Sequence, residues 1–301
     1  MELRHLRYFV AVADEGHMTR AAIRLGIQQP PLSQQIQALE SELGVKLFER
    51  TARSIRLNAI GKLFLNDAKK ILALSEEAVA SVKKAARGEL GCIRIGYNNS
   101  SSMHWLAPNI ISAFRAEYPL ITLKVRENTT RELLLALEQE QLDIAFIRSS
   151  VAKYPSVELV CLHNEPVVVA LPIDHRLAKE KDKPISLSEL EVEDFVLCCR
   201  SDDGPGMQDA LLAACHKAGF NPHVVEEVPR LISTVTLVAA GRGVSIIPET
   251  MQSIHAASVV FRKLDEASSF TVPLNLAYPS NREDKIIDHF IELAKKAKTL
   301  K

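Results

Sequence analysis

Apolar residues near the start of the chain recur at helical spacing in three successive groups. The first group predicts an amphipathic helix that begins near Leu3 and ends at Gly16, and the second predicts a short helix over residues 18–25 that Gly26 closes. A third helix is predicted from residue 28 to Leu43, because the two prolines near its start suit the first turn of a helix. The residues that define the three groups are Leu3, Leu6, Phe9, Val10 and Ala13, then Ala21, Ala22 and Leu25, then Leu32, Ile36, Leu39 and Leu43.

The third helix carries a polar face without charges. Ser33, Gln34 and Gln37 lie opposite its apolar residues. A helix that is merely solvated more often carries lysine and glutamate there, whereas uncharged donors and acceptors are suited to reading base edges in a major groove. Two short helices, a tight turn and this third helix together predict a DNA-binding helix-turn-helix.

Residues 46–58 predict two short strands around a basic turn, which is the pattern of a wing. Arg50, Arg53 and Arg56 would hold phosphates or enter the minor groove. Three arginines in a loop are, taken singly, more often just solvated. Their position directly after a recognition-type helix favours contact with DNA.

Residues 59–87 contain no proline and predict one helix of about 28 residues, or about 40 Å. Its narrow apolar stripe is formed by Phe64, Ala68, Ile71, Ala78 and Val82. A long helix with a single stripe usually pairs with another helix, so we expect a homodimer through this segment. The alternative, a helix packed on its own body, stays open at this stage. Gly88 and Gly91 predict a hinge that follows.

From Cys92 onward the pattern changes to alternating strands and helices, which predicts an α/β body of about 210 residues with two small sheets. Strands are expected at residues 93–97, 121–126, 144–147, 157–162, 166–171, 195–198 and 274–278, with another after Gly241. Helices are expected at residues 105–117, 130–138, 206–218, 231–240 and 284–298.

Two hydroxyl-rich segments follow the carboxyl ends of neighbouring predicted strands. Ser100, Ser101 and Ser102 come after the first strand of the body, and Thr129 and Thr130 come after the second. Ligands of α/β sheets sit at such strand ends, where helix N-terminal N–H groups attract anions. Ordinary N-capping explains either segment alone about equally well.

Arg148 follows a third strand and turns the balance toward a carboxylate-binding pocket. Among the nine histidines only His104, beside Trp105, lies near this predicted pocket, and a structural role is the simpler interpretation of it.

Composition limits the class of protein but identifies no binding or catalytic residues. The net charge is zero, but residues 1–90 hold 14 Lys/Arg against 10 Asp/Glu, and residues 91–301 hold 23 against 27. A basic head and an acidic body fit a protein whose head alone meets a polyanion. No apolar run approaches the roughly 20 residues of a membrane span, and charges among the first apolar residues do not fit a signal peptide. We therefore expect a cytoplasmic protein without a membrane partner.

The five cysteines form no CxxC pair, so no structural zinc site is expected, and no metal or cofactor is implied. Dinucleotide-loop, P-loop, zincin and nucleophile-elbow patterns are absent, which predicts a protein that is not an enzyme. Two alternatives stay open: a small-molecule-binding protein with an incidental helical head, and a redox sensor acting through Cys198 or Cys199, for which buried reduced thiols are the simpler interpretation.

The head resembles that of LysR-type transcriptional regulators. The resemblance rests on RHLRYFVAVA, the alanine pair after Thr19, QPPLSQQIQALE, LGVKLFER and the RSIRL wing, and the opening and the proline pair look most like members that control aromatic-compound catabolism. Matched position by position, it implies DNA contacts at Gln29, Pro30, Pro31, Ser33, Gln34 and Arg53. This chain departs from many relatives by carrying glutamine at position 34, where they have arginine, which implies a different base preference.

The same resemblance implies a body similar to periplasmic binding proteins and a tetrameric assembly on promoter DNA. The expected domains are a winged helix-turn-helix at 1–58, a linker helix at 59–87 and an effector-binding domain at 88–301. Subdomain I would comprise 91–162 and 270–301, and subdomain II 163–269. A small-molecule effector, an organic acid or aromatic compound, would lie between them, with Ser201 and Asp202 on the wall opposite the serines and threonines. The acidic residues of that wall do not favour a simple dianion.

Overall fold

The computed structural model describes residues 1–50, 55–149, 151, 153–180, 182–200, 206–281 and 283–297, apart from the side chain of Arg50. The predicted site residues Arg53, Ser201 and Asp202 lie outside this range. The chain divides into two compact units, a head unit (Met1–Ala86) and a body unit (Arg87–Lys301). Over the residues described, no helix is both long and apolar enough to cross a membrane.

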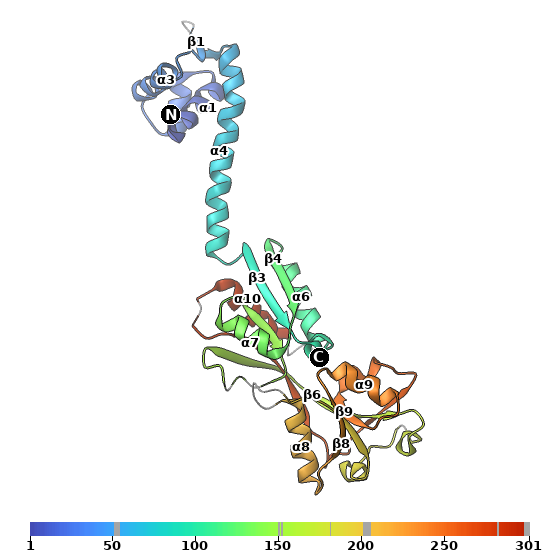
Figure 1. The fold of residues 1–301 in the computed structure, drawn as a ribbon. Helices are drawn as coiled ribbons and strands as arrows, with labels where there is room; N and C mark the ends of the chain where they lie inside the picture. The colour runs from blue at the N-terminus through green and yellow to red at the C-terminus, as the bar shows by residue number, and fades with distance from the viewer. Residues whose placement is uncertain are drawn as a thin grey trace. The chain divides into compact units, whose positions relative to one another are not determined.

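The described part of the head unit contains three short helices that pack on one another, and the first of them also packs on the first half of a long fourth helix (Figure 1). The short helices are α1 (Leu3–Glu15), α2 (Met18–Leu25) and α3 (Gln29–Leu43). The ring of Phe9 lies at the centre of their core, 5.3 Å from Phe48 and 5.0 Å from Phe64. Strands β1 (Phe48–Arg50) and β2 (Ile55–Leu57) form the predicted antiparallel pair. The winged helix-turn-helix is thereby confirmed.

The fourth helix, α4 (Ala59–Ala86), is continuous over 28 residues, as predicted (Figure 1). The predicted apolar stripe divides into a part that is packed and a part that is exposed. Phe64 and Ala68 pack into the head core, whereas Ile71 and Val82 are exposed. Leu74 and Val79 are further exposed apolar residues of the second part, and Leu63 is exposed beside the first. Most of the apolar surface of this helix is therefore not used within the head unit.

The first sheet of the body unit has the strand order β6-β11-β5-β3-β4. Its strands are β3 (Gly91–Tyr97), β4 (Ile121–Glu127), β5 (Ile144–Ile147), the first part of β6 (Val157–Pro172) and β11 (Thr271–Pro279). Helices α6 (Leu106–Glu117) and α10 (Lys285–Ala297) share a buried core with one face, and α7 (Thr130–Glu138) covers the other. Because β3, β4 and β5 run parallel, their carboxyl ends meet at one edge of the sheet.

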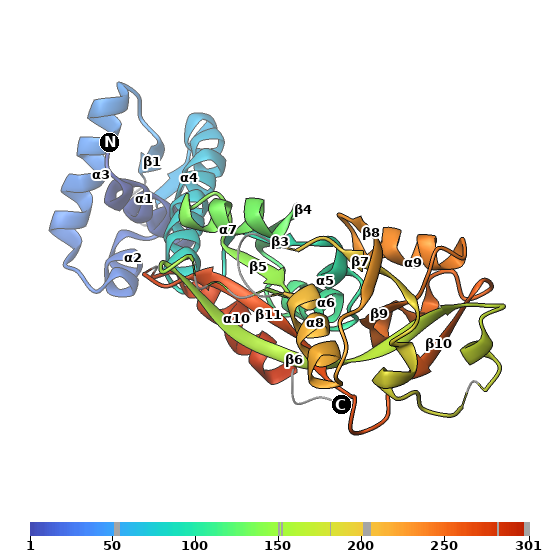
Figure 2. The same ribbon diagram turned by 60° about the horizontal axis from the view of Figure 1, so that its bottom comes forward.

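Strand β6 passes from this sheet into a second one, where it pairs with β9 and β10 (Figure 2). Beside it a parallel pair, β7 and β8, forms a separate two-stranded sheet, which is joined to the second sheet by the hydrogen bond from the Val196 N–H to the Val244 carbonyl. The elements on this side of the crossing are β7 (Asp194–Cys198), α8 (Met207–Lys217), β8 (His223–Val228), α9 (Leu231–Ala239), β9 (Ser245–Pro248) and β10 (Val259–Lys263). In the part of the body unit that the structure describes, 3-10 helices accompany them at Arg176–Ala178, Leu187–Leu190 and Glu249–Ser253.

The structure differs from the predicted pattern in two ways. The strands expected at 157–162 and 166–171 are one strand, β6, because the polar residues between them mark the crossing between sheets rather than a turn. The short helix α5 (Asn99–Ser102) and the strands β8 and β10 were not predicted. All the helices predicted from the sequence are present among the described residues.

Candidate functional site

The outer face of α3 presents the residues predicted to read DNA. Gln29, Pro30 and Pro31 are exposed in its first turn, and Gln34 and Gln37 are exposed further along. Ser33 is half-buried on the same side, while Leu32, Ile36 and Leu39 are fully buried on the other. The structure thus places the uncharged polar residues together on a solvent-facing surface at the start of the second helix of a helix-turn-helix.

Glu40, buried at 3% exposure on α3, ties that helix to the wing. Its Oε1 accepts hydrogen bonds from the Leu47 and Phe48 N–H groups at 2.9 and 3.2 Å, and Lys46 Nζ lies 3.0 Å from Oε2. Burial alone would raise the pKa of Glu40, but these hydrogen bonds and the Lys46 charge hold that pKa below its ordinary value of 4.5. The carboxylate therefore fixes the start of β1 relative to the recognition-type helix.

Replacing Glu40 with glutamine should cost the head unit about 1–2 kcal/mol at neutral pH, because neutral hydrogen bonds replace charge-assisted ones. Since the folded pKa is depressed, the Glu40 contribution is present above the ordinary pKa and is lost as the pH falls below it. Hydrogen–deuterium exchange of the Leu47 and Phe48 amides measures this directly. The exposed neighbour Glu49, changed to glutamine, is the control; equal protection in both variants would contradict the assigned role of Glu40.

Of the wing arginines, Arg56 on β2 is exposed. The side chains of Arg50 and Arg53 lie outside the described part of the chain. The wing therefore offers one placed cation for phosphate contact, and the contribution of the other two stays a prediction.

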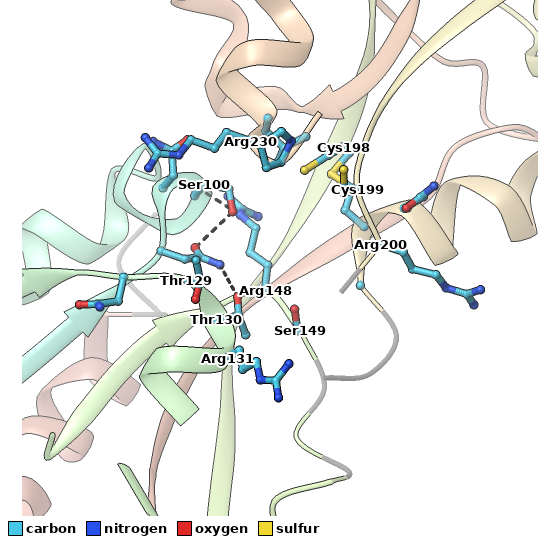
Figure 3. A pocket seen from close by; sticks show the side chains of 18 of the residues that line it. Ser100, Thr129, Thr130, Arg131, Arg148, Ser149, Cys198, Cys199, Arg200 and Arg230 are labelled. Atoms are coloured by element: carbon cyan, nitrogen blue, oxygen red, sulfur yellow. Dashed lines mark hydrogen bonds between the residues drawn. The ribbon is translucent and has the colours of Figure 1, made fainter. Parts of the chain in front are cut away.

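A cavity of about 860 Å³, here called the main cavity, lies between the two sheets of the body unit. Its walls are formed where β3, β4 and β5 end on one side and where β7 and β8 end on the other (Figure 3). Helices α5, α7, α8 and α9 begin at the same place. This is the position at which α/β proteins bind ligands.

The hydroxyl-rich segments lie at this cavity, but several of their groups are already engaged. Ser100, Thr129 and Thr130 line it, whereas Ser101 is fully buried and donates to the Phe146 carbonyl at 2.7 Å. The Ser102 hydroxyl donates to the Asn99 carbonyl at 2.8 Å. Both therefore hold α5 in place rather than facing a ligand, which corrects that part of the expectation.

Helix capping accounts for Thr129 as well, and the Thr130 hydroxyl accepts a hydrogen bond from the Asn98 side-chain amide at 3.0 Å. The Thr129 hydroxyl donates to the Glu132 carboxylate at 2.9 Å, and the same carboxylate accepts from the Thr129 N–H at 2.9 Å. The start of α7 thus has an anion of its own chain, so an anionic ligand would need another partner there. Helix α9 differs, because no side chain caps it at Arg230.

Arg148 is the group that supplies this partner. It follows β5 directly, lines the main cavity and is only 5% exposed. Its Nη2 lies 2.5 Å from Glu165 Oε2 and its Nε donates to the Ser100 carbonyl at 3.4 Å, while Nη1 has no hydrogen-bond partner among the described residues. In Figure 3 the side chain lies between Ser100 and the threonines on one wall and Cys199 and Arg200 on the other. A buried guanidinium with an unused donor is suited to a carboxylate.

The charges around the main cavity are mixed. Among the described residues, the arginines that line it are Arg131, Arg148, Arg200 and Arg230, and the carboxylates are Glu127, Glu132 and Asp209. Arg200 pairs with Asp209, which also caps the start of α8 through the Gly206 N–H at 2.8 Å. With Glu132 and Asp209 occupied, the lining favours an anion of low charge.

The two neighbouring cysteines also line the main cavity. Burial raises the pKa of Cys198 to about 11, so its thiol is protonated at neutral pH. Because the thiolate is the form that oxidants attack, Cys198 is a poor redox sensor. Over the described residues, no group of three His, Cys, Asp or Glu side chains is placed to hold a metal ion.

Sequence reasoning missed Glu165 and the role of its neighbours. The signal that could have identified Glu165 was its charge within an apolar strand, since a buried carboxylate requires a partner.

A second cavity of about 610 Å³ shares Arg148 with the main cavity and is lined mostly by apolar residues of β6, α8 and β11.

Two family models match the chain. The model for the bacterial regulatory helix-turn-helix protein of the lysR family matches residues 3–62, and the model for the LysR substrate binding domain matches residues 86–299. The uncharacterized HTH-type transcriptional regulator YnfL of Escherichia coli (strain K12) is 38% identical over 94% of this chain and 94% of its own length.

Solved structures agree over the whole chain. The crystal structure of CbnR, a LysR family transcriptional regulator, superposes with a TM-score of 0.86 at 29% identity and covers 98% of this chain and 100% of CbnR. Full-length CbnR complexed with its target DNA superposes with a TM-score of 0.84 at 29% identity, covering 99% of this chain and 100% of CbnR. The resemblance noted in the sequence is thereby confirmed.

Proposed function

Because this chain belongs to the LysR family of DNA-binding transcriptional regulators, we propose that a small carboxylate bound in the main cavity switches its reading of a promoter. The observation that carries this proposal is Arg148, a buried cation whose Nη1 has no partner among the described residues at the cavity wall. The chain does not catalyse a reaction in this account, and it acts in the cytoplasm.

On the DNA side, the proposed base-reading residues are Gln29, Ser33, Gln34 and Gln37, with Pro30 and Pro31 setting the start of α3. Their support is the exposed, uncharged face that they form. Arg50, Arg53 and Arg56 of the wing are proposed to contact phosphates or the minor groove.

Replacing Arg56 with alanine should weaken binding to all DNA sequences alike. One lost phosphate contact lowers the slope of log affinity against log salt by about one, without changing which sequence is preferred. Fluorescence anisotropy between 50 and 200 mM salt, with a specific and a random duplex, measures both quantities. Arg126, an exposed arginine of the body unit, changed to alanine, is the control. A change of preference in the Arg56 variant would contradict its assignment to phosphate.

On the effector side, the proposed contacts are Ser100, Thr129, Thr130 and Arg148, with Ser201 and Asp202 from the segment that lies outside the described residues.

We further propose domain boundaries of 1–58, 59–87 and 88–301, with subdomain I at 91–162 and 270–301 and subdomain II at 163–269. Their support is that separate buried cores lie on the two sides of the β6 crossing. A homodimer through α4, assembled further into a tetramer, presents two heads to two half-sites.

A thermal-shift screen of the full chain tests the effector class. Small aliphatic carboxylates, aromatic acids, amines and nucleobases are compared, and a carboxylate at 100 times its dissociation constant should stabilise the folded body by about 2.7 kcal/mol. The same compounds on an Arg148→Lys variant should give a smaller shift, because a lysine lacks the guanidinium fork. Stabilisation by amines alone, or by no class, would contradict a carboxylate effector.

A further inference from the structure

Three titratable side chains meet at the point where β6 crosses between the two sheets. Glu165 on β6 accepts the Thr250 N–H at 2.7 Å through Oε1, while Arg148 Nη2 lies 2.5 Å and His104 Nε2 lies 3.8 Å from its Oε2. All three are buried, with exposures of 5% or less. One carboxylate oxygen thus lies between an arginine at the main cavity and a histidine that points away from solvent.

His104 is held in one orientation and has one atom unused. Its Nδ1 accepts the Leu106 N–H at 3.1 Å, and Nε2 has no hydrogen-bond partner among the described residues. Because Nδ1 is an acceptor, Nε2 carries the hydrogen in the neutral ring. The pKa of His104 is lowered to about 4, mainly by burial and also by Arg148 and His163, while Glu165 acts upward. The ring is therefore neutral at pH 7 as long as Arg148 is ion-paired with Glu165.

We propose that the main cavity takes up its carboxylate together with one proton, which His104 receives when the carboxylate binds Nη1 of Arg148 and weakens the ion pair between Arg148 and Glu165. This deepens the proposed function, on which it rests, by making the effector site proton-linked. The bound carboxylate neutralises the Arg148 charge, and Glu165, freed from part of its ion pair, becomes the partner of a protonated His104. The proton comes from solvent and binds Nδ1, which then no longer accepts the Leu106 N–H, while the hydrogen on Nε2 points toward Glu165.

Carboxylate binding should favour a protonated His104 through the charged and titratable groups that face its ring. Arg148, which follows β5, and His163, whose ring centroid lies 5.3 Å away on β6, both oppose a positive charge on the ring. Glu165 favours it. Cancelling the Arg148 charge removes one of the two opposing groups and strengthens the favouring one, so binding should tighten as the pH falls from 7 toward 5.

The chain contains a reporter for this proton. Trp105 is the sole tryptophan, and its ring stacks on His104 with centroids 5.4 Å apart and planes at 29°. A protonated imidazole beside an indole quenches its fluorescence more than a neutral one. The pH midpoint of Trp105 quenching in the full-length protein therefore follows the charge of His104 without a label.

The first arm of the test needs no ligand. Changing Arg148 to methionine mimics a neutralised arginine and should raise the quenching midpoint by about one pH unit or more, whereas Glu165→Gln should lower it. Arg131→Met, which removes an exposed arginine from the same cavity, should leave it unchanged. A midpoint in Arg148→Met equal to that of the parent protein, or a transition that survives in His104→Gln, overturns the proposal. If Arg148→Met fails to fold, the Glu165→Gln variant tests the proposal instead, because its quenching midpoint should lie at a lower pH than that of the parent protein.

The second arm uses formate, a carboxylate that stays ionised between pH 5 and 7. Formate should raise the quenching midpoint of the parent protein and bind several-fold more tightly at pH 5 than at pH 7, with the pH dependence absent in His104→Gln. Equal pH dependence in both proteins, or no formate binding at either pH, overturns the proton-linked site. Sequence-selective DNA binding by the same samples is measured separately, so a failure of the proposed function is distinguished from a failure of the proton linkage.

Discussion

Replacing Glu165 with alanine is expected to destabilise the body unit by about 3–5 kcal/mol, because it leaves Arg148 buried with a charge that nothing offsets. The same change removes the acceptor of the Thr250 N–H, which ties β6 to the 3-10 helix at Glu249–Ser253. Urea unfolding of the full chain, followed by Trp105 fluorescence, measures the loss. Glu158, an exposed glutamate on the same strand, changed to alanine, should cost no more than about 0.5 kcal/mol.

A double variant separates charge from volume. Arg148→Met/Glu165→Leu removes both charges and keeps apolar bulk, so it should be more stable than Glu165→Ala alone. If the single variant unfolded at the same urea concentration as the Glu158 control, the buried pair would not be the structural link between the two sheets. The proton-linked site would then lose its physical basis as well.

Placing aspartate at both Leu74 and Val82 is expected to convert the protein to a monomer at micromolar concentration. Both side chains are exposed on α4, at 62% and 70%, and lie on one side of the helix with Ile71 and Ala78. In a symmetric dimer each position occurs twice, and each buried side chain contributes about 1.5–3 kcal/mol. The double variant should also lose most of its affinity for a two-half-site operator while retaining weak binding to one half-site.

Ala80→Asp provides a matched control for the dimer interface. It introduces one aspartate into the same helix, but about 200° around the axis from Ala78 and so on the opposite side. Sedimentation velocity of the three proteins compares their masses. A Leu74→Asp/Val82→Asp variant that sediments like the parent protein would show that α4 packs elsewhere, the alternative that the sequence left open.

The sequence predicted the elements with regular patterns and missed those whose pattern is set by tertiary contacts. The three helices of the head and the linker helix follow from apolar spacing and from Gly16 and Gly26 at their ends. Strand β6 was predicted as two strands because His163, Asn164 and Glu165 interrupt its apolar run. That interruption exists because the strand changes sheets there and because Glu165 is buried against Arg148.

The candidate site shows the same division. Arg148 and the segments after β3 and β4 were predicted, because ligand sites of α/β sheets lie at strand ends. Which serines and threonines remain available could not be predicted, since capping by Glu132 and the hydrogen bond of Ser101 depend on the folded geometry. His104 was identified by position alone, and its contact with Glu165 required a residue 61 positions away in the sequence.

Selection of bound sequences from a random DNA library tests whether the exposed face of α3 selects the promoter. The full-length protein should enrich two half-sites about one helical turn or a multiple apart, and Arg56→Ala should enrich the same bases with lower yield. The Ser33→Ala/Gln34→Ala variant should lose discrimination at the bases it reads, by about 1–3 kcal/mol for each lost contact. The same enriched motif from that double variant, with undiminished selectivity, would contradict the assignment of α3 as the element that reads DNA.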